Sequence, residues 1–354
     1  MRGTTVEMSG QSAERQPIYD SWRGVAVLCV LVGHYFWNPG INVGRFGVEL
    51  FFVLSGTLMA KLLFDERQPL LDFAVRRFSR IYPMLAVFIA VVAALAIALP
   101  QLGALTYLDI VSGLTFTFNN VHASADAGAS IGPIAHIWSV CVEAHSYLIL
   151  GAIAFAHRRW RVPVLPTILI IAGLMMAYGV VLHLASPQYY GVYWRTEVRA
   201  ASVLIGAACY LSVARIPERI GSWTFAALPI LLASFIFQTD PVPDPIKYTV
   251  GTTLAALSLT LLARQHGGLL SKLASAPPLV FLGTISYSLY LWQFPLLYFG
   301  GNRIVLAGVA LLLSCLSCWL VEKPARRALN RLLSPRGRFE TAQARSERAI
   351  QPAE

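Results

Sequence analysis

Two ionisable side chains, Arg23 and His34, lie eleven residues apart in the first apolar stretch of the sequence. On an α-helix, at about 100° per residue, this spacing ends about 20° from three full turns, so both side chains share one face. They are separated by about 16 Å along the helix axis. An ionisable residue inside a membrane is costly and normally faces a cavity or a partner. The pair therefore predicts an internal polar site, although a snorkelling arginine and a histidine hydrogen-bonded within a bundle would also account for it.

Three further polar side chains, Glu49, Glu143 and Gln293, lie inside apolar stretches that we interpret as membrane spans. At about 1.5 Å of rise per residue, they fall with His34 in the outer half of the membrane. One shared pocket would satisfy all four side chains, and so would separate hydrogen bonds between packed helices. A histidine close to carboxylates can act as a general base, because a carboxylate fixes its tautomer and stabilises the imidazolium.

A short basic run, Arg76, Arg77 and Arg80, lies at the cytoplasmic edge of the third predicted span. Arg80 is three residues from Arg77 and four from Arg76, so the guanidinium groups can gather on one helical face. Guanidinium forks bind phosphate oxygens well. The alternative is that the run anchors the protein at lipid headgroups. No set of His, Cys, Asp and Glu residues has a convincing metal-ligand spacing, so we expect no metal.

The composition indicates what must position these residues. Of 354 residues, 56% are apolar and 13% are charged, and the mean hydropathy is +0.60, whereas soluble domains carry about 25% charged residues. A membrane span needs about 20 apolar residues, and this criterion predicts an all-α, polytopic transmembrane helical bundle of about ten spans. The predicted spans are 22–38, 44–63, 83–100, 136–156, 164–185, 197–214, 223–238, 247–263, 279–299 and 303–321.

The basic residues predict the orientation of this bundle. Of the 28 Lys and Arg residues, 23 fall in segments assigned to the cytoplasm and 5 in segments assigned to the outside. This asymmetry favours both termini in the cytoplasm, which requires an even number of spans. Because the basic residues form short runs between apolar stretches, we expect membrane lipids and no nucleic acid as partners. We expect a cytoplasmic segment at 1–19, one transmembrane domain at 20–328 and a disordered cytoplasmic tail at 329–354.

Six ordered segments together resemble the acyltransferase-3 family of integral-membrane O-acyltransferases, which acylate sugars of lipopolysaccharide, exopolysaccharide, Nod factors and some macrolides. The resemblance begins with an arginine and a histidine eleven residues apart and spans residues 20–326. The segments are DSWRGVA at 20–26 with His34, GVELFFVLSG at 47–56, RRFSRIYP at 76–83, HIWSVCVE at 136–143, ISYSLYLW at 285–292 and EKPAR at 322–326.

This sequence departs from the family pattern at three places. Many members have aspartate at the position of Glu49, and members often have histidine at the position of Gln293. The usual Glu-Gln-Phe-Tyr after Glu143 is replaced by Ala-His-Ser-Tyr, which introduces His145. These departures leave secondary roles for Gln293 and His145 open, and they are compatible with a different acceptor.

The resemblance implies that the protein moves an acetyl group from cytoplasmic acetyl-CoA to a hydroxyl of an envelope or exopolysaccharide sugar in the bacterial inner membrane. Arg77 and Arg80, with Arg76 assisting, would hold the phosphates of the donor. Its pantetheine arm would pass Arg23 toward His34, which acts as a base or carries the acetyl group. The acceptor would be a glycan or lipid-linked saccharide on the outer side.

Glu143 would orient His34 or balance its charge in this scheme. A transporter or flippase for a lipid-linked glycan is the alternative, since it too needs buried charges and many spans. A structural subunit of a polysaccharide export complex is a further alternative, but it leaves the shared face of Arg23 and His34 unexplained. The choice of acetyl over succinyl or a longer acyl group is not fixed by these residues.

Overall fold

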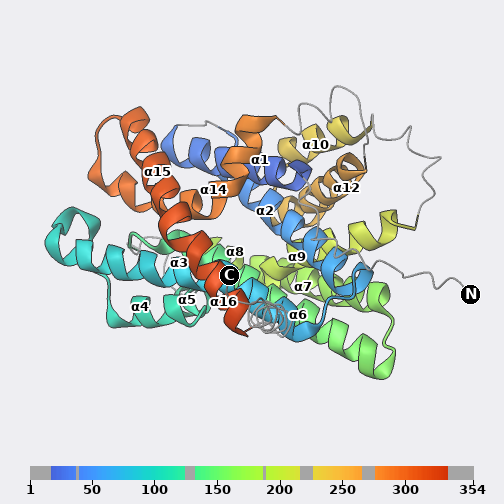
Figure 1. The fold of residues 1–354 in the computed structure, drawn as a ribbon. Helices are drawn as coiled ribbons and strands as arrows, with labels where there is room; N and C mark the ends of the chain where they lie inside the picture. Colours follow the sequence, from blue (N-terminus) through green and yellow to red (C-terminus); the bar gives the residue numbers. More distant parts are fainter. Residues whose placement is uncertain are drawn as a thin grey trace, which may run out of the picture.

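The computed structural model describes residues 17–36, 40–123, 132–185, 189–215, 226–264 and 276–333. Within these ranges every regular element is a helix, and the only β-type pairing is an isolated bridge between Ile41 and Thr239. The fold is therefore all-α, as the sequence predicts. Figure 1 shows the helices gathered into one bundle, in which segments distant in the sequence lie side by side.

The α-helices follow one another along the described ranges, and several continue directly into short helical turns of different pitch. The α-helices are α1 (Pro17–Tyr35), α2 (Val43–Ala60), α3 (Leu70–Ala98), α4 (Tyr107–Leu114), α5 (Phe118–His122), α6 (Trp138–Trp160), α7 (Val164–Ala185), α8 (Tyr189–Tyr193), α9 (Thr196–Val213), α10 (Ala227–Ile236), α11 (Asp244–Ile246), α12 (Thr252–Ala263), α14 (Pro277–Gln293), α15 (Arg303–Ser317) and α16 (Lys323–Leu333). The π-helical turns are η1 (Lys61–Asp65), η5 (Lys247–Gly251) and η7 (Cys318–Glu322), and the 3₁₀ turns are η2 (Pro100–Leu102), η3 (Ala135–Ile137) and η6 (Pro295–Phe299).

Seven helical runs in the described part of the chain are long and apolar enough to cross a membrane, so the chain is a multi-pass membrane protein. These runs are Val43–Asp65, Leu70–Ala98, Ala135–Trp160, Val164–Ala185, Thr196–Val213, Asp244–Ala263 and Arg303–Leu333. The three remaining predicted spans fall on α1, α10 and α14, which lie outside this set.

Helix α3 differs from its prediction, because it begins at Leu70 and runs for 29 residues with Pro83 inside it. The arginines before Pro83 therefore belong to the spanning helix itself. The predicted tail also begins inside a helix, since α16 extends to Leu333, and residues 334–354 lie outside the described residues. Likewise α1 begins at Pro17, within the segment assigned to the N-terminal extension, of which residues 1–16 are outside the described residues.

Helix α2 lies at the centre of the bundle, packed against α1, α9, α12 and α6 (Figure 1). Glycines permit the closest of these contacts. A Cβ on Gly56 of α2 would lie 1.9 Å from the Val203 carbonyl oxygen, and a Cβ on Gly206 of α9 would lie 2.3 Å from the Val53 carbonyl oxygen. Small residues at a crossing let two helix backbones approach, which is the usual way that membrane helices pack.

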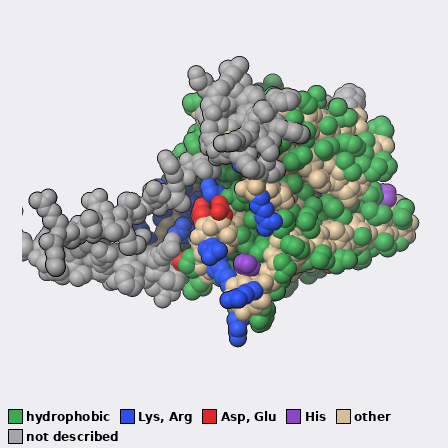
Figure 2. Space-filling model, turned by 90° about the vertical axis from the view of Figure 1, so that its right-hand side faces the viewer, with side chains coloured by type: hydrophobic (Ala, Val, Ile, Leu, Met, Phe, Trp, Pro, Cys, Tyr) green, Lys and Arg blue, Asp and Glu red, His purple; other side chains and the backbone are tan. Residues whose placement is uncertain are grey.

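The perimeter of the bundle is apolar. In α7 and in the run from α15 to α16, only 17% of an 18-residue apolar segment is buried, so most of their side chains face outward. Lipid tails are a suitable solvent for such surfaces. Figure 2 shows one surface that is largely hydrophobic, with Lys and Arg side chains grouped on it beside a few acidic side chains and a histidine.

Candidate active site

Helix α1 is continuous from Pro17 to Tyr35, so Arg23 and His34 lie on the same face as the spacing predicts. The two side chains nevertheless face different spaces. Arg23 lines a cavity between α1, α2, α3, α6 and α14, which we call the inner cavity. His34 lines a second space, the outer cavity, formed by the end of α1, the start of α2 and the start of α15.

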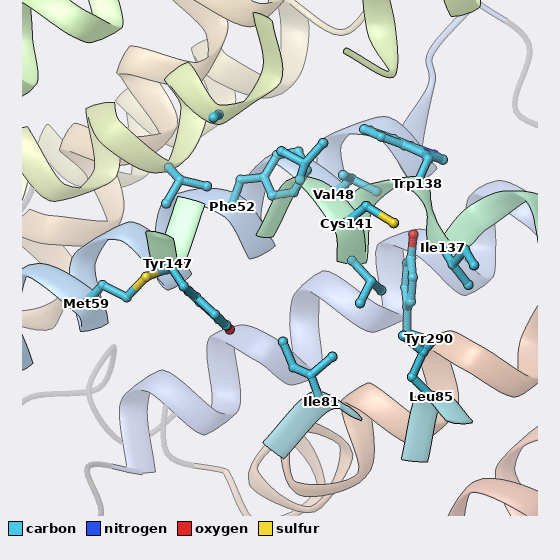
Figure 3. Close-up of a cluster of buried hydrophobic side chains, with 14 of the residues drawn as sticks. Val48, Phe52, Met59, Ile81, Leu85, Ile137, Trp138, Cys141, Tyr147 and Tyr290 are labelled. Atoms are coloured by element: carbon cyan, nitrogen blue, oxygen red, sulfur yellow. The ribbon is translucent and has the colours of Figure 1, made fainter. Parts of the chain in front are cut away.

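The inner cavity combines charged and apolar side chains. Its polar wall is formed by Arg23, Ser55, Arg80, Ser139, Glu143, Ser286, Tyr287 and Tyr290. Val48, Phe52 and Ile81 belong to its apolar wall, and Figure 3 shows them within the surrounding cluster of buried side chains. The cavity volume is about 50 Å³, which is room for a few water molecules. The side chains around it therefore nearly close it.

Glu143 is the carboxylate that lines the inner cavity. Its Oε1 accepts hydrogen bonds from Ser55 Oγ at 2.5 Å and from Tyr147 OH at 2.7 Å. The Glu143 carboxylate also interacts electrostatically with the guanidinium groups of Arg23, Arg77 and Arg80. This carboxylate therefore balances arginines contributed by α1 and α3, and its hydrogen bond from Ser55 holds α2 to α6.

His34 is held by a different residue from the one expected. Its Nδ1 lies 2.9 Å from Gln293 Oε1, and its ring packs edge-on against Phe294 with centroids 5.3 Å apart. Gln293 is itself fixed by two hydrogen bonds. Its side-chain Nε2 donates to the Tyr290 backbone carbonyl at 3.2 Å, and its backbone carbonyl accepts from Tyr35 OH at 2.7 Å. With an amide oxygen as partner, Nδ1 carries the proton and Nε2 is left as the basic nitrogen.

The expectation that Glu143 orients His34 is thus not met by the contacts of either side chain. Glu143 is hydrogen-bonded to Ser55 and Tyr147, and His34 to Gln293. The reason is the crossing of α1 and α14, which packs the end of α14 against the end of α1. Gln293, which the sequence places with His34 in the outer half of the membrane and which departs from the family pattern, occupies the place that a tautomer-fixing group requires.

The outer cavity is larger and more polar, with a volume of about 520 Å³. Besides His34, its lining includes Tyr35, Asn42, Asp240 and Arg303. Tyr290 lines the inner cavity, and its carbonyl accepts the hydrogen bond from the Gln293 amide that holds His34. The backbone of Tyr290 and the side chain of Gln293 therefore lie between the two spaces.

The basic run on α3 divides between two directions. Arg80 lines the inner cavity. The Arg77 guanidinium lies over the rings of Phe73 and Tyr147, at 5.6 Å and 5.8 Å from their centroids, and its buried Nε has no hydrogen-bond partner among the described residues. Arg76 is exposed. Arg80 is therefore the arginine of this run that lines the inner cavity, whereas Arg77 lies over two aromatic rings.

Glu49 belongs to a separate buried network. Its carboxylate pairs with Arg199 of α9 and accepts a hydrogen bond from Thr252 Oγ1 at 2.8 Å. Arg199 also lies over the Tyr193 ring, 4.8 Å from its centroid. Arg199, one of the five basic residues assigned to the outside, lies near the start of the predicted span 197–214, and its side chain is fully buried inside the bundle. The polar residues of the spans are thus satisfied in separate groups, which is the second of the two alternatives.

Neighbouring residues complete the description. His145 Nδ1 lies 2.6 Å from Thr196 Oγ1 and is not hydrogen-bonded to Glu143. Tyr147, Ser55 and Tyr290 were missed by the sequence analysis, although Tyr147 follows Glu143 by four residues and so shares its helical face. Within the described residues, no group of three or more His, Cys, Asp and Glu residues could hold a metal ion.

These features define a class: a multi-pass helical membrane protein with arginines and a carboxylate around an inner cavity and a histidine facing an outer one. Residues 17–322 match the family described as an acyltransferase domain (Acyl_transf_3). The chain belongs to this family, which confirms the resemblance carried by the six sequence segments.

Several relatives share most of the chain. It is 30% identical to the peptidoglycan O-acetyltransferase OatA of Listeria monocytogenes over 310 residues, which cover 79% of this chain and 49% of that protein. It is 27% identical to the O-acetyltransferase OatA of Staphylococcus aureus over 318 residues, or 82% and 52% of the two chains. A putative peptidoglycan O-acetyltransferase of Bacillus subtilis, YrhL, is 30% identical over 353 residues, or 88% and 55%. The chain thus spans about half the length of these relatives. No solved structure matches significantly.

Proposed function

We propose that this protein is a membrane O-acetyltransferase that moves an acetyl group from cytoplasmic acetyl-CoA to a sugar hydroxyl of an envelope polysaccharide. The observation that carries the proposal is the placement of Arg23 and His34 on one helix, each lining a different cavity, with Gln293 and the Tyr290 backbone between. A donor and an acceptor that approach from opposite sides need such an arrangement. The names of the relatives support a glycan acceptor, with peptidoglycan as the first to test.

The proposed topology has about ten spans with both termini in the cytoplasm of a bacterium, in its inner membrane. The seven long apolar runs account for seven of these spans, and α1, α10 and α14 account for the other three. The excess of Lys and Arg in the segments assigned to the cytoplasm supports this orientation. We assign residues 20–328 to the transferase domain, with short cytoplasmic segments on either side of it.

The donor side of the site is the inner cavity. Arg77 and Arg80 bind phosphate groups of the donor, because guanidinium forks match phosphate oxygens, Arg80 lines the cavity and Arg77 precedes it by one turn of α3. Arg76, which is exposed, contributes at the surface. Arg23 lies further along the path toward His34, and Glu143 keeps the arginines from repelling one another when no donor is bound.

The chemical step takes place at His34. In direct transfer, Nε2 removes the proton of the acceptor hydroxyl while its oxygen attacks the thioester carbonyl, the C–S bond breaks, and the coenzyme leaves as a thiolate that takes up a proton. In the two-step route, Nε2 attacks the thioester carbonyl, the C–S bond breaks and coenzyme A leaves as a thiolate. The acceptor hydroxyl then attacks the acetyl carbon, the bond to Nε2 breaks to restore His34, and the hydroxyl proton passes to the thiolate. Both routes need Nε2 unprotonated, which the hydrogen bond between Nδ1 and Gln293 secures.

The acceptor side is the outer cavity. Its lining of Tyr35, Asn42, Asp240 and Arg303 offers donors and acceptors for sugar hydroxyls and charged substituents. An acceptor seated there places a hydroxyl next to His34. A lipid-linked or growing glycan at the outer leaflet fits this access, and no part of the scheme calls for a metal ion.

The test is acetyl transfer by the purified protein in nanodiscs, with acetyl-CoA and soluble peptidoglycan fragments. Wild-type protein forms O-acetylated product, and His34→Ala lowers its rate by at least about a hundredfold. The control is His183→Ala, which removes a histidine near the end of α7. A glycan transporter would consume no acetyl-CoA, and loss of His34 would instead stop movement of the glycan. Undiminished transfer by His34→Ala would contradict the proposed role of this residue.

A further inference from the structure

Helix α16 carries a second group of basic side chains. Its residues Lys323–Leu333 form the last part of the run Arg303–Leu333 and include Lys323, Arg326, Arg327 and Arg331. None of its residues is fully buried, and Arg326, Arg327 and Arg331 are exposed. A short helix of this kind is strongly amphipathic, with its charges directed away from the apolar perimeter.

This helix packs against α3, the helix that carries the phosphate-binding arginines proposed above. The contact includes a hydrogen bond of 2.7 Å from Ser79 Oγ to Asn330 Oδ1. Ser79 directly precedes Arg80 in α3. Arg326 is four residues before Asn330, one turn away, and therefore lies on the face of α16 that approaches α3. The hydrogen bond thus holds α16 against the turn of α3 that carries Arg80, with Arg326 one turn from the contact.

A buried carboxylate connects the two basic groups. Glu322 is 7% exposed, and its Oε2 accepts a hydrogen bond from Ser288 Oγ of α14 at 2.8 Å. Its charge interacts with Arg80 on one side and with Arg326 and Lys323 on the other. Glu143 and Asp20 also interact with this group, so three carboxylates face the five cations Arg23, Arg77, Arg80, Lys323 and Arg326, and positive charge is in excess among these side chains.

We infer that the junction of α3 and α16 binds the 3′-phosphate of the adenosine end of an acyl-CoA donor, with Arg326 as a binding residue. This inference rests on the proposed function, because it names where the far end of the same donor is held. The adenosine end carries the phosphates of coenzyme A, and it remains at the mouth while the thioester end enters the narrow cavity beside Arg80. Charge complementarity and this position favour the nucleotide over a lipid headgroup, because a headgroup has no thioester arm that would enter the cavity.

The experiment compares acetyl-CoA with 3′-dephospho-acetyl-CoA as donors for the purified protein in nanodiscs of neutral lipid. Wild-type protein has a KM about tenfold lower for acetyl-CoA, the size expected for one charge-assisted contact. In Arg326→Ala we expect the two donors to have about equal KM values, because the variant lacks the side chain that binds the 3′-phosphate. Arg159→Ala, an exposed arginine near the end of α6, is the matched control and keeps the wild-type ratio.

Adding phosphatidylglycerol to the nanodiscs tests whether an anionic lipid headgroup occupies the junction of α3 and α16. If headgroups filled the junction, the two donors would have equal KM values in wild-type protein and in Arg326→Ala, and only the dependence of activity on anionic lipid would change. That result would overturn the inference while leaving the proposed function intact. Wild-type protein that consumed neither donor would instead overturn the proposed function and, with it, this inference.

Discussion

At the scale of single residues, the hydrogen bond between His34 and Gln293 is the most informative contact of the site. A general base must present one nitrogen unprotonated, and the partner of the other nitrogen decides which. Here the partner is a neutral amide, so the imidazole is oriented without a neighbouring negative charge. Glu143 is thereby left to balance the arginines of the inner cavity.

Substituting Gln293 tests this assignment. Gln293→Ala frees the ring of His34, so we expect the kcat for acetyl transfer to fall by about ten- to a hundredfold, as for other groups that orient a catalytic ligand. The KM for acetyl-CoA should stay within about twofold, because the donor-binding arginines are untouched. Gln238→Ala is the control, since Gln238 is equally buried but its side chain makes no hydrogen bond to the described residues. An unchanged kcat in Gln293→Ala would contradict a positioning role.

The sequence indicates the residues of the site better than their partners. The shared face of Arg23 and His34 follows from helical periodicity alone, and so does the position of Arg77 one turn before Arg80. The partner of His34 could not be derived in this way, because it depends on how α1 crosses α14. That crossing needs Gly283, where a Cβ would lie 1.6 Å from the Asp20 carbonyl oxygen, and such a contact between distant segments has no local signature.

At the scale of helices, a fully buried ion pair and a close crossing with α9 help to hold α2 in the bundle. The pair joins Glu49 of α2 to Arg199 of α9, and Thr252 of α12 completes it. Because both charges are buried, removing one leaves the other without compensation. The sequence shows Glu49 as an intramembrane charge but gives no sign of its partner, since Arg199 lies near a predicted helix end.

We therefore expect Glu49→Ala to lower the free energy of unfolding by about 3–5 kcal/mol. Thermal unfolding in detergent, followed by tryptophan fluorescence, measures the change. Removing both charges in Glu49→Ala with Arg199→Met should recover part of the loss, because no uncompensated charge remains. A double variant less stable than Glu49→Ala would contradict the pairing as the cause.

The crossing of α2 and α9 gives an independent test of the packing. Gly56→Ala places a methyl group against the Val203 backbone, so the helices must separate and the unfolding temperature should fall by several degrees. Gly173→Ala is the matched control, because a Cβ at Gly173 of α7 meets nothing within 4 Å. That change should be neutral or slightly stabilising through helix propensity. Equal effects of the two substitutions would argue against a close crossing.

At the scale of the whole molecule, the proposed reaction depends on the two cavities opening to opposite sides of the membrane. The inner cavity lies beside the basic residues of α3, and the outer cavity includes Arg303 at the start of α15. The apolar runs establish that the chain crosses the membrane several times. The direction of crossing follows only from the distribution of Lys and Arg, which acts during insertion and leaves no contact in the folded bundle.

Labelling of single cysteines tests the orientation of the chain in the membrane. Arg159→Cys near the end of α6 and Arg303→Cys at the start of α15 replace exposed side chains, and a membrane-impermeant maleimide is applied to spheroplasts and to inverted vesicles. We expect position 303 to react in spheroplasts and position 159 only in inverted vesicles. The unsubstituted chain gives the background, because its five cysteines are buried or only partly exposed. Labelling of both positions from one side would place the donor and acceptor cavities on the same face and exclude transfer across the membrane by the route through His34.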